Sequence, residues 1–599
     1  MAGILVLTGI AGLFVVVLRA PLRSSFATFV GASLLLPAGL DVPHDRFGFF
    51  TISRLLTVAL LGRLLTAVRR REVVGLALRA TPVHLAFAVF AIVACYDGLA
   101  LAAPATSGAD ALFGAANIVD QLVTFVTVTA VVVALDDLPF VLRWVAGSLV
   151  AVMAIGVGEH FLGHSYAHAV GGLLPGQPLS TTLDAFQYRG GQLRARSAAS
   201  FALELAWMGV LALPVLFAMT RITRGRERRA WIAGLALVVL AVYWTYSRSV
   251  LIGLPLIGAA FAAATRDRRV GRAVAAVVAA ALLAALTAPT LFSRFSLSVD
   301  PSSIKIRELR LPFLLALVAP RAVHGLGFGG LIPSGLANPD NGYVLAYAEI
   351  GVVGLVGLGA LLAAALVTSG RGLRATDPSA RLAAGIGVTA VLGIAAAALA
   401  YNGFTAAYTV RLTWILVAIG VAAGQRAVGP AALPRPSWGR VAATAGVAEV
   451  LGLALYAAAP VHFAQASSFA ALPVAAEDVP FNPVQQGEQL ANTVCDLAGS
   501  VRRQLGGAQI SCRDLTTGLG LGQLRVQAGT RTELRAAQAV LLDDLAGTPG
   551  LTGVRVIVER PPVAGITTGL RTAPLWLPLS ALAVTGMLPR TDRRRRRAR

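Results

Sequence analysis

Apolar runs of about 17–25 residues recur along the whole chain, and they restrict its fold more than any other feature of the sequence. A run of about 20 apolar residues forms a helix long enough to cross the hydrocarbon core of a membrane. The composition agrees, because 56% of the residues are hydrophobic and only 13% are charged, whereas soluble domains carry about 25% charged residues. We therefore expect an all-α polytopic membrane protein.

The runs predict about 15 transmembrane helices. The expected spans are 3–19, 25–40, 50–67, 81–103, 117–135, 138–158, 197–219, 230–247, 249–265, 273–290, 343–368, 382–400, 411–424, 441–459 and 572–588. No charged segment precedes the first run, so we expect a membrane span there and not a cleaved signal peptide.

Arginine clusters indicate which ends of these helices share a side of the membrane. The formal net charge is +22, and the arginines stand in short clusters between the apolar runs. In the predicted order all of these clusters fall on one side, which the positive-inside rule assigns to the cytoplasm. The tail "RTDRRRRRAR" is typical of a segment beside anionic lipid. No aromatic residues interleave with its arginines, so we expect no nucleic acid. The acidic "LDDLP" near Asp136 falls on the same side and is the weakest point of this topology.

Three regions follow from this topology. Residues 1–459 form the transmembrane domain, with loops 159–196 and 291–342 on the outer face. Residues 460–571 form a small extracytoplasmic α+β domain, and residues 572–599 form the last transmembrane helix and a basic cytoplasmic tail.

Within residues 460–571, "QLRVQA" and "VRVIVE" alternate like half-buried strands. A helix between them is predicted by a capping box, Thr530 with Glu533, and a further helix is expected around 485–505. Cys495 on that helix and Cys512 on the next strand either form a disulfide outside the cytoplasm or remain unpaired.

Outer-face arginines break the positive-inside pattern and need another explanation. Arg248 lies in a hairpin between two spans, "VYWTYSRSVLIG". A guanidinium there suits bidentate contact with a phosphate, although an arginine that only snorkels to lipid headgroups is the alternative. Arg189, Arg194 and Arg196 precede the span that contains Glu204, and they suit either an anionic ligand or lipid phosphates.

The second outer loop ends at a helix start that is unusually polar. "SSIKIRELRLPFLLALV" places Arg307 and Arg310 on a predicted amphipathic helix at the membrane surface, and "HGLGFGG" predicts a flexible stretch. In "ANPDNGYVLAYAEIG", Asp340 and Asn341 occupy the N-cap region of the next span. Capping explains only one of these two residues.

The same span continues with Tyr343 and Glu349. Gly351, Gly354 and Gly357 follow at intervals of three, which predicts a stripe for close helix packing.

Together these motifs resemble the O-antigen ligase and polysaccharide polymerase family. The resemblance covers roughly residues 50–425 and rests on the order and shared face of "YRGGQLRAR", "TYSR", "VHGLGFGG" and "DNGYVLAYAEIGVVGLVG". Ligases that act on lipopolysaccharide typically have histidine before the asparagine, where this chain has Asp340. That difference favours chain extension, as in the polymerase-type relatives, without deciding between the two.

The resemblance implies a glycosyltransferase on the outer face of the bacterial cytoplasmic membrane. It would move glycan from a polyprenyl pyrophosphate carrier to an acceptor hydroxyl, with no metal, cofactor or nucleotide sugar. Its partners would be the lipid-linked glycan, a glycan or glycolipid acceptor, membrane lipid and, through residues 460–571, other polysaccharide-assembly proteins. The implied catalytic residues are Asp340 and Asn341, and the implied substrate-binding residues are Arg248, Arg189, Arg194, Arg307, Arg310, Tyr343 and Glu349.

A metal site and a transporter are the alternatives to this function. His160, His164 and His168 share one face of a continuous helix, but the triple spans about 12 Å, too far for one metal ion. A transporter or flippase of lipid-linked glycan is the alternative function. Against it, the chain shows no internal repeat, and ionisable residues inside its spans, such as Arg54, Arg63 and Glu204, are few.

Overall fold

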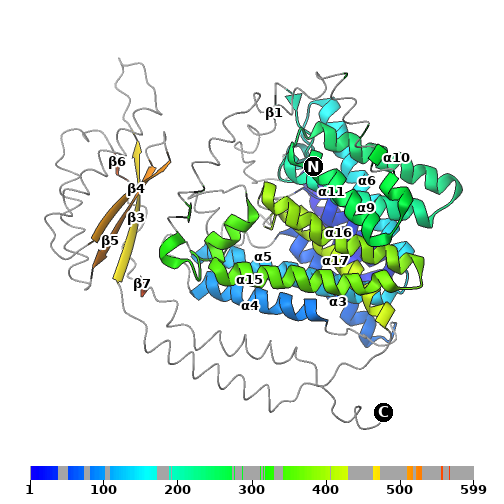
Figure 1. Cartoon of the computed structure of the whole chain (residues 1–599), viewed down its shortest axis with the longest axis horizontal. Helices are drawn as coiled ribbons and strands as arrows, with labels where there is room; N and C mark the ends of the chain where they lie inside the picture. The colour runs from blue at the N-terminus through cyan, green and yellow to red at the C-terminus, as the bar shows by residue number, and fades with distance from the viewer. Residues whose placement is uncertain are drawn as a thin grey trace, which may run out of the picture.

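The computed structural model of the protein is predominantly helical (Figure 1). It describes residues 2–37, 51–72, 81–100, 108–171, 188–189, 192–272, 275–276, 279, 287, 311, 314–315, 318–328, 341–401, 403–404, 406–428, 463–472, 509–516, 521–528, 555–556 and 565–566.

The long helices coincide with predicted spans. They are α1 (Ala2–Arg19), α2 (Leu22–Leu35), α3 (Ile52–Arg69), α4 (Pro82–Ala100), α5 (Gly108–Leu135), α6 (Leu138–Leu162), α9 (Ala202–Ile222), α10 (Gly225–Trp244), α11 (Ser249–Thr265), α15 (Gly342–Arg371), α16 (Pro378–Ala400) and α17 (Ala407–Val428). Short elements between them are α7 (Tyr166–Gly171), β1 (Tyr188–Arg189), β2 (Gln192–Leu193), η3 (Ala319–Arg321) and η4 (Gly372–Arg374). The predicted spans 273–290, 441–459 and 572–588 lie mostly or wholly outside the described residues.

Within the described residues, six helices are long and apolar enough to cross a membrane, which is consistent with a multi-pass membrane protein. These are α5 from Gly114, α6, α9, α15 continued to Arg374, α16, and α17 to Arg426. Helix α10 also has 20 residues, but its first turns carry the sequence GRERR. These six helices support part of the predicted set of about 15 spans, and the full number stays a prediction.

Ion pairs join the arginine clusters at one end of the bundle, which we call the basic end. It comprises the loops around residues 20–23, 136–137, 221–227, 266–268 and 371–377, with Arg426. The pairs, with their N···O distances, are Arg23–Asp137 (2.5 Å), Arg426–Asp136 (2.8 Å), Arg143–Glu227 (2.8 Å) and Arg221–Asp267 (2.9 Å). The acidic "LDDLP" segment thus fits this end, because Asp136 and Asp137 both accept from arginines. Exposed ion pairs add little stability. They do show which loops lie together at this end.

Close packing of small residues holds α15, α16 and α17 together (Figure 1). A Cβ added to Gly387 of α16 would lie 2.7 Å from the Cα of Gly420 in α17 and 2.9 Å from the Oγ of Ser369 in α15. Apolar packing between helices gains nothing from water exclusion inside a membrane, so backbones that approach this closely are a main source of helix association there.

Helix α15 is broken at Gly351, whose φ of 67° and ψ of −160° are not helical. The segment Ala322–Gly327 pairs with the break through four backbone hydrogen bonds. Leu326 N and Gly327 N donate to the carbonyls of Ala348 and Glu349 at 2.8 and 2.9 Å, and Val352 N and Val353 N donate to Ala322 and Val323 at 2.9 and 3.2 Å. We call this paired segment, residues 322–327, the clamp.

The predicted flexible stretch "HGLGFGG" overlaps the clamp. Leu326 N and Gly327 N donate to carbonyls of α15, and Gly325 lies against the backbone of Glu349, whereas Gly329 and Gly330 lie outside the described residues. The three glycines of α15 do not form one packing stripe, contrary to the prediction. Gly351 supplies the positive φ of the break and Gly354 faces Ile350 of its own helix, so only Gly357 meets another helix, at Phe90 of α4.

Among the described residues toward the C-terminus, five strands pair in one sheet. They are β3 (Phe463–Leu472), β4 (Gln509–Thr516), β5 (Leu521–Ala528), β6 (Arg555–Val556) and β7 (Gly565–Ile566), in the order β4-β5-β3-β6 with β7 on β3. Strands β5 and β6 fall on the two predicted strands, and both pair antiparallel with β3 between them. Strand β3 was not predicted. Cys512 lies on β4 as expected, whereas Cys495 and the helices expected at 485–505 and after Thr530 lie outside the described residues.

Substitution of Gly387 by alanine tests the close contact of α16 with its neighbours. We expect Gly387→Ala to destabilise the protein by about 1–3 kcal/mol, because the new methyl group overlaps α17 and Ser369. Gly359→Ala in α15 is the matched control, since a Cβ there meets nothing within 4 Å. Thermal unfolding in detergent would measure both variants, and equal melting temperatures would contradict the packing described here.

Candidate functional site

The candidate site lies at the end of the bundle opposite the basic end, which we call the distal end. It gathers the loop after α6, the hairpin between α10 and α11, the loop between α16 and α17, and the start of α15. Buried hydrogen bonds tie these four segments to one another.

The hairpin that carries Arg248 is a tight turn from Thr245 to Arg248. Tyr246 adopts a left-handed conformation with φ 48°, and its ring is buried. The Thr245 hydroxyl donates to the carbonyl of Val242 at 2.7 Å and so closes the last turn of α10. Arg248 then occupies the N-cap position of α11 and is half-buried.

Arg194 reaches this hairpin from a distant part of the sequence. Its Nε donates to the carbonyl of Thr245 at 2.8 Å and its Nη2 donates to the Oγ of Ser247 at 3.1 Å. A cation is favourable here, since the carbonyls at the end of α10 carry the negative end of its dipole. The structure thus brings two of the predicted arginines, Arg194 and Arg248, to one turn.

The other predicted arginines divide into two groups. Arg196 is buried, and its Nε and Nη2 donate to the Oγ of Ser165 at 3.0 and 2.7 Å. Arg189 lies in β1, which pairs with β2, and its side chain is outside the described residues. Arg307 and Arg310 also lie outside the described residues, as does Asp340.

His160 belongs to the arginine side of the site and does not share a helix face with the other two histidines. Helix α6 ends at Leu162, Gly163 follows with a left-handed φ of 68°, and α7 starts only at Tyr166. The three histidines therefore do not lie on one continuous helix, contrary to the prediction. The His160 ring stacks on Trp244, with centroids 4.9 Å apart, and its Nδ1 lies 2.8 Å from the carbonyl of Leu193. The described part of the chain contains no group of three or more potential metal ligands.

Asn341 caps the start of α15. Its Oδ1 accepts from the backbone N–H groups of Tyr343 and Val344 at 3.0 and 3.1 Å, and its Nδ2 donates to the carbonyl of Leu399 at 3.4 Å. An asparagine at this position satisfies N–H groups that a helix start otherwise leaves unpaired. The cap position is therefore filled by the residue after Asp340.

The side chains of Tyr343 and Glu349 point into the helix bundle and not toward the start of α15. The Tyr343 hydroxyl donates to the carbonyl of Ala395 in α16 at 3.0 Å. Glu349 is 2% exposed and lies six residues after Tyr343, about 9 Å along the helix axis. The polar residues of this segment are thus distributed between the helix start and the bundle interior.

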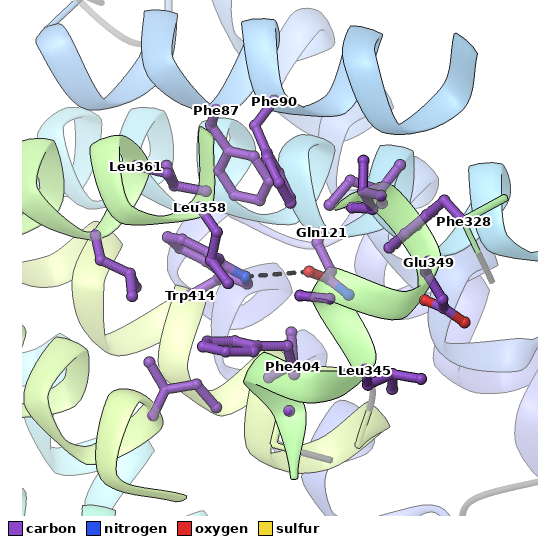
Figure 2. A pocket seen from close by; sticks show the side chains of 17 residues that line it. Phe87, Phe90, Gln121, Phe328, Leu345, Glu349, Leu358, Leu361, Phe404 and Trp414 are labelled. Carbon is purple, nitrogen blue, oxygen red and sulfur yellow. Dashed lines mark hydrogen bonds between the residues drawn. The ribbon is translucent and has the colours of Figure 1, made fainter. Parts of the chain in front are cut away.

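Glu349 borders a small apolar cavity that reaches from α4 to α17 (Figure 2). Its volume of about 40 Å³ holds a few water molecules at most. Figure 2 shows aromatic rings of Phe87, Phe90, Phe404 and Trp414 around it, with Phe328 beside Glu349. In this conformation the cavity is too small for a sugar ring.

Ionisable residues inside the bundle were missed by sequence reasoning. Asp120 of α5 and Arg411 of α17 form an ion pair at 2.5 Å, and each side chain is only 11% exposed. Next to it, the Nε1 of Trp414 donates to the Oε1 of Gln121 at 3.3 Å. Both charges lie inside predicted spans, where an ionisable residue is a functional hypothesis by default. The predicted spans therefore hold more ionisable residues than Arg54, Arg63 and Glu204.

Residues 193–201 form a bridging loop between the arginine hairpin and the start of α15. At one end, Ala195 N donates to the carbonyl of Trp244 at 3.1 Å, beside the contacts of Arg194. At the other end, the rings of Phe201 and Tyr401 meet edge to face with centroids 5.8 Å apart. The carbonyl of Tyr401 accepts from Gly342 N at 3.0 Å. One short segment thus contacts both halves of the candidate site.

The Tyr401 hydroxyl fixes the loop between α16 and α17 by donating to the Oγ1 of Thr409 at 2.7 Å. Burial raises the pKa of this phenol well above its usual value, and the nearby charge of Glu204 raises the pKa further. The group therefore stays protonated and acts as a hydrogen-bond donor.

No protein-family model matches the chain, and no curated protein matches it.

Proposed function

We propose that the protein is a membrane glycosyltransferase of the O-antigen ligase and polysaccharide polymerase kind, acting on glycan linked to polyprenyl pyrophosphate. One observation carries the proposal: Arg194 binds the turn that leads directly into Arg248, at the end of the bundle opposite the arginine clusters. Two guanidinium groups at one turn suit a pyrophosphate, because each can offer paired donors to phosphate oxygens.

In the proposed reaction the acceptor hydroxyl attacks the anomeric carbon of the lipid-linked sugar. The new glycosidic bond forms as the bond from that carbon to the pyrophosphate oxygen breaks, and the pyrophosphate leaves with the electron pair. Arg194 and Arg248, with Arg189, Arg307 and Arg310, would offset the charge that develops on it. Asp340 would orient the acceptor hydroxyl and take its proton, beside Asn341 at the start of α15.

The proposed location is the bacterial cytoplasmic membrane, with about 15 spans. The basic end would face the cytoplasm, in keeping with the positive-inside rule, and the distal end would face outward. Residues 460–571 would form an extracytoplasmic α+β domain that contacts other polysaccharide-assembly proteins. The lipid tail of the carrier would lie among the membrane helices.

A transporter or flippase of lipid-linked glycan is the second candidate. The buried pair Asp120–Arg411 and the break in α15 at Gly351 favour it, because discontinuous helices and intramembrane charges occur at transport sites. An assay in proteoliposomes separates the two candidates. The transferase makes a larger glycan from polyprenyl-pyrophosphate oligosaccharide, and the flippase only moves that oligosaccharide between leaflets.

Cysteine labelling tests the proposed topology. In a background without Cys95, Cys495 and Cys512, a membrane-impermeant maleimide added to intact cells should label a cysteine placed at Gln486. It should not label a cysteine placed after Arg590, because the arginine clusters set the orientation. Labelling of the tail without labelling at Gln486 would reverse the orientation.

Arg248 should be needed for its geometry and not only for its charge. We expect Arg248→Ala to abolish glycan elongation at normal protein levels, and Arg248→Lys to lose most activity, since lysine cannot make the bidentate contact. Sizing of glycan products from purified protein is the measurement. Arg228→Ala is the matched control, because Arg228 is an exposed arginine at the far end of α10. Full activity of Arg248→Ala would leave Arg248 as a lipid anchor.

Asp340→Asn tests the acid–base role of Asp340. If Asp340 orients or deprotonates the acceptor, the change should lower the turnover rate by about 100-fold or more. Asp377→Asn is the matched control, because Asp377 caps α16 at the basic end by accepting from Ser379 N and Ala380 N at 3.0 and 3.2 Å, and asparagine caps about as well. Wild-type turnover in Asp340→Asn would remove Asp340 as the base.

A further inference from the structure

Two buried carboxylates hold the two ends of the bridging loop in the same way. Glu159 accepts from Arg196 N and Ser197 N at 2.9 and 2.5 Å through one oxygen, and from Tyr166 N at 2.6 Å through the other. Glu204 accepts from Tyr408 N and Thr409 N at 2.7 and 3.3 Å through one oxygen, and from Ser200 N at 2.9 Å through the other. Each carboxylate therefore fastens two separate chain segments to one point.

Glu159 acts at the arginine end of the loop. It lies in the last turn of α6, and Ser197, which it binds, has a left-handed φ of 57°. The turn it stabilises stands two residues after Arg194, whose guanidinium contacts Thr245 and Ser247. Glu159 therefore holds the chain within two residues of Arg194.

Glu204 acts at the other end of the loop. It is fully buried in the first turn of α9 and caps α17, since Tyr408 and Thr409 belong to the first turn of that helix. Thr409 in turn accepts from Tyr401, whose carbonyl holds Gly342 at the start of α15. A chain of hydrogen bonds therefore runs from Glu204 to the residue next to Asn341.

We propose that Glu159 and Glu204 are positioning residues of the candidate site, Glu159 for the arginine hairpin and Glu204 for the start of α15. The inference rests on the proposed function for its kinetic consequences only. Both carboxylates are occupied by backbone N–H groups, so neither is placed to act on substrate, and their effect passes through Arg194 and Asn341.

Glutamine is the sharpest substitution at both positions. It keeps the shape of the side chain but replaces one accepting oxygen by an NH₂ group, which faces backbone donors and cannot pair with them. The matched control is Glu227→Gln at the basic end, where a partly exposed glutamate makes an ion pair with Arg143 at 2.8 Å.

Hydrogen exchange of the purified full-length chain in detergent tests the positioning without reference to any activity. We expect Glu159→Gln to speed exchange by about tenfold in residues 193–197, because the amides of Arg196 and Ser197 lose a charged acceptor. Exchange in residues 244–248 should rise as well, because Arg194 then holds the hairpin less firmly. Glu204→Gln should do the same in residues 401–409 and 341–345. Neither change should alter exchange at residues 221–227, and Glu227→Gln should leave all four distal segments unchanged.

Kinetics then separate positioning from general stability. Glu159→Gln should raise the KM for the lipid-linked donor by about tenfold, because it displaces the arginine that binds pyrophosphate. Glu204→Gln should lower kcat by about tenfold or more with little change in that KM, because it displaces the acceptor side.

Three results would overturn the inference: uniformly faster exchange that includes residues 221–227, unchanged exchange in the distal segments, or equal losses of kcat in both variants at unchanged KM. If the wild-type protein makes no glycan product, the proposed function fails, and the exchange pattern alone decides whether the two carboxylates position the distal end.

Discussion

A backbone N–H or C=O group that leaves regular structure inside an apolar bundle must find a partner in the protein, because no water is available there. The distal end is organised by this requirement. Between α6 and α9, and between α16 and α17, the chain leaves helical structure and presents free N–H groups to the interior. Glu159 and Glu204 accept from six such groups between them. A buried carboxylate with several N–H donors is stable where a lone one would not be.

This requirement also explains why functional candidates and structural residues lie so close together. The groups that satisfy the backbone are themselves polar and sit at the same end as the arginines. Arg194 donates to the carbonyl of Thr245 at the end of α10 and to the Ser247 hydroxyl, in the turn that leads into Arg248. Asn341 caps α15 while it follows Asp340 in the sequence. The same contacts therefore fix the geometry of the distal end and stabilise the helices that form it.

Helix positions could be predicted from the sequence because the ends of each apolar run mark the ends of a helix. Helix α11 is an example, since it was predicted and is observed at 249–265. The common end of the arginine clusters within the described residues was also predictable, since it depends only on the alternation of spans. The role of Glu204 was not, because its partners Tyr408 and Thr409 are some 200 residues away. The clamp was missed for the same reason: glycines suggest flexibility locally, whereas Gly325 and Gly351 are required because a Cβ on either would meet the other segment's backbone at 2.3–2.4 Å.

The break in α15 also bears on the choice between the two proposed functions. Discontinuous helices in transporters bind ions and substrates through backbone groups that the break exposes. In α15 the clamp occupies these groups, since Ala348 and Glu349 accept from it and Val352 and Val353 donate to it. The break therefore presents no spare N–H from these residues to an anionic substrate. Its effect is to redirect the first part of α15, residues 342–350, which carries Tyr343 and begins at Asn341. The break thus affects the part of α15 that begins at the distal end. This arrangement suits a fixed site at that end better than a transport site in the middle of the bundle.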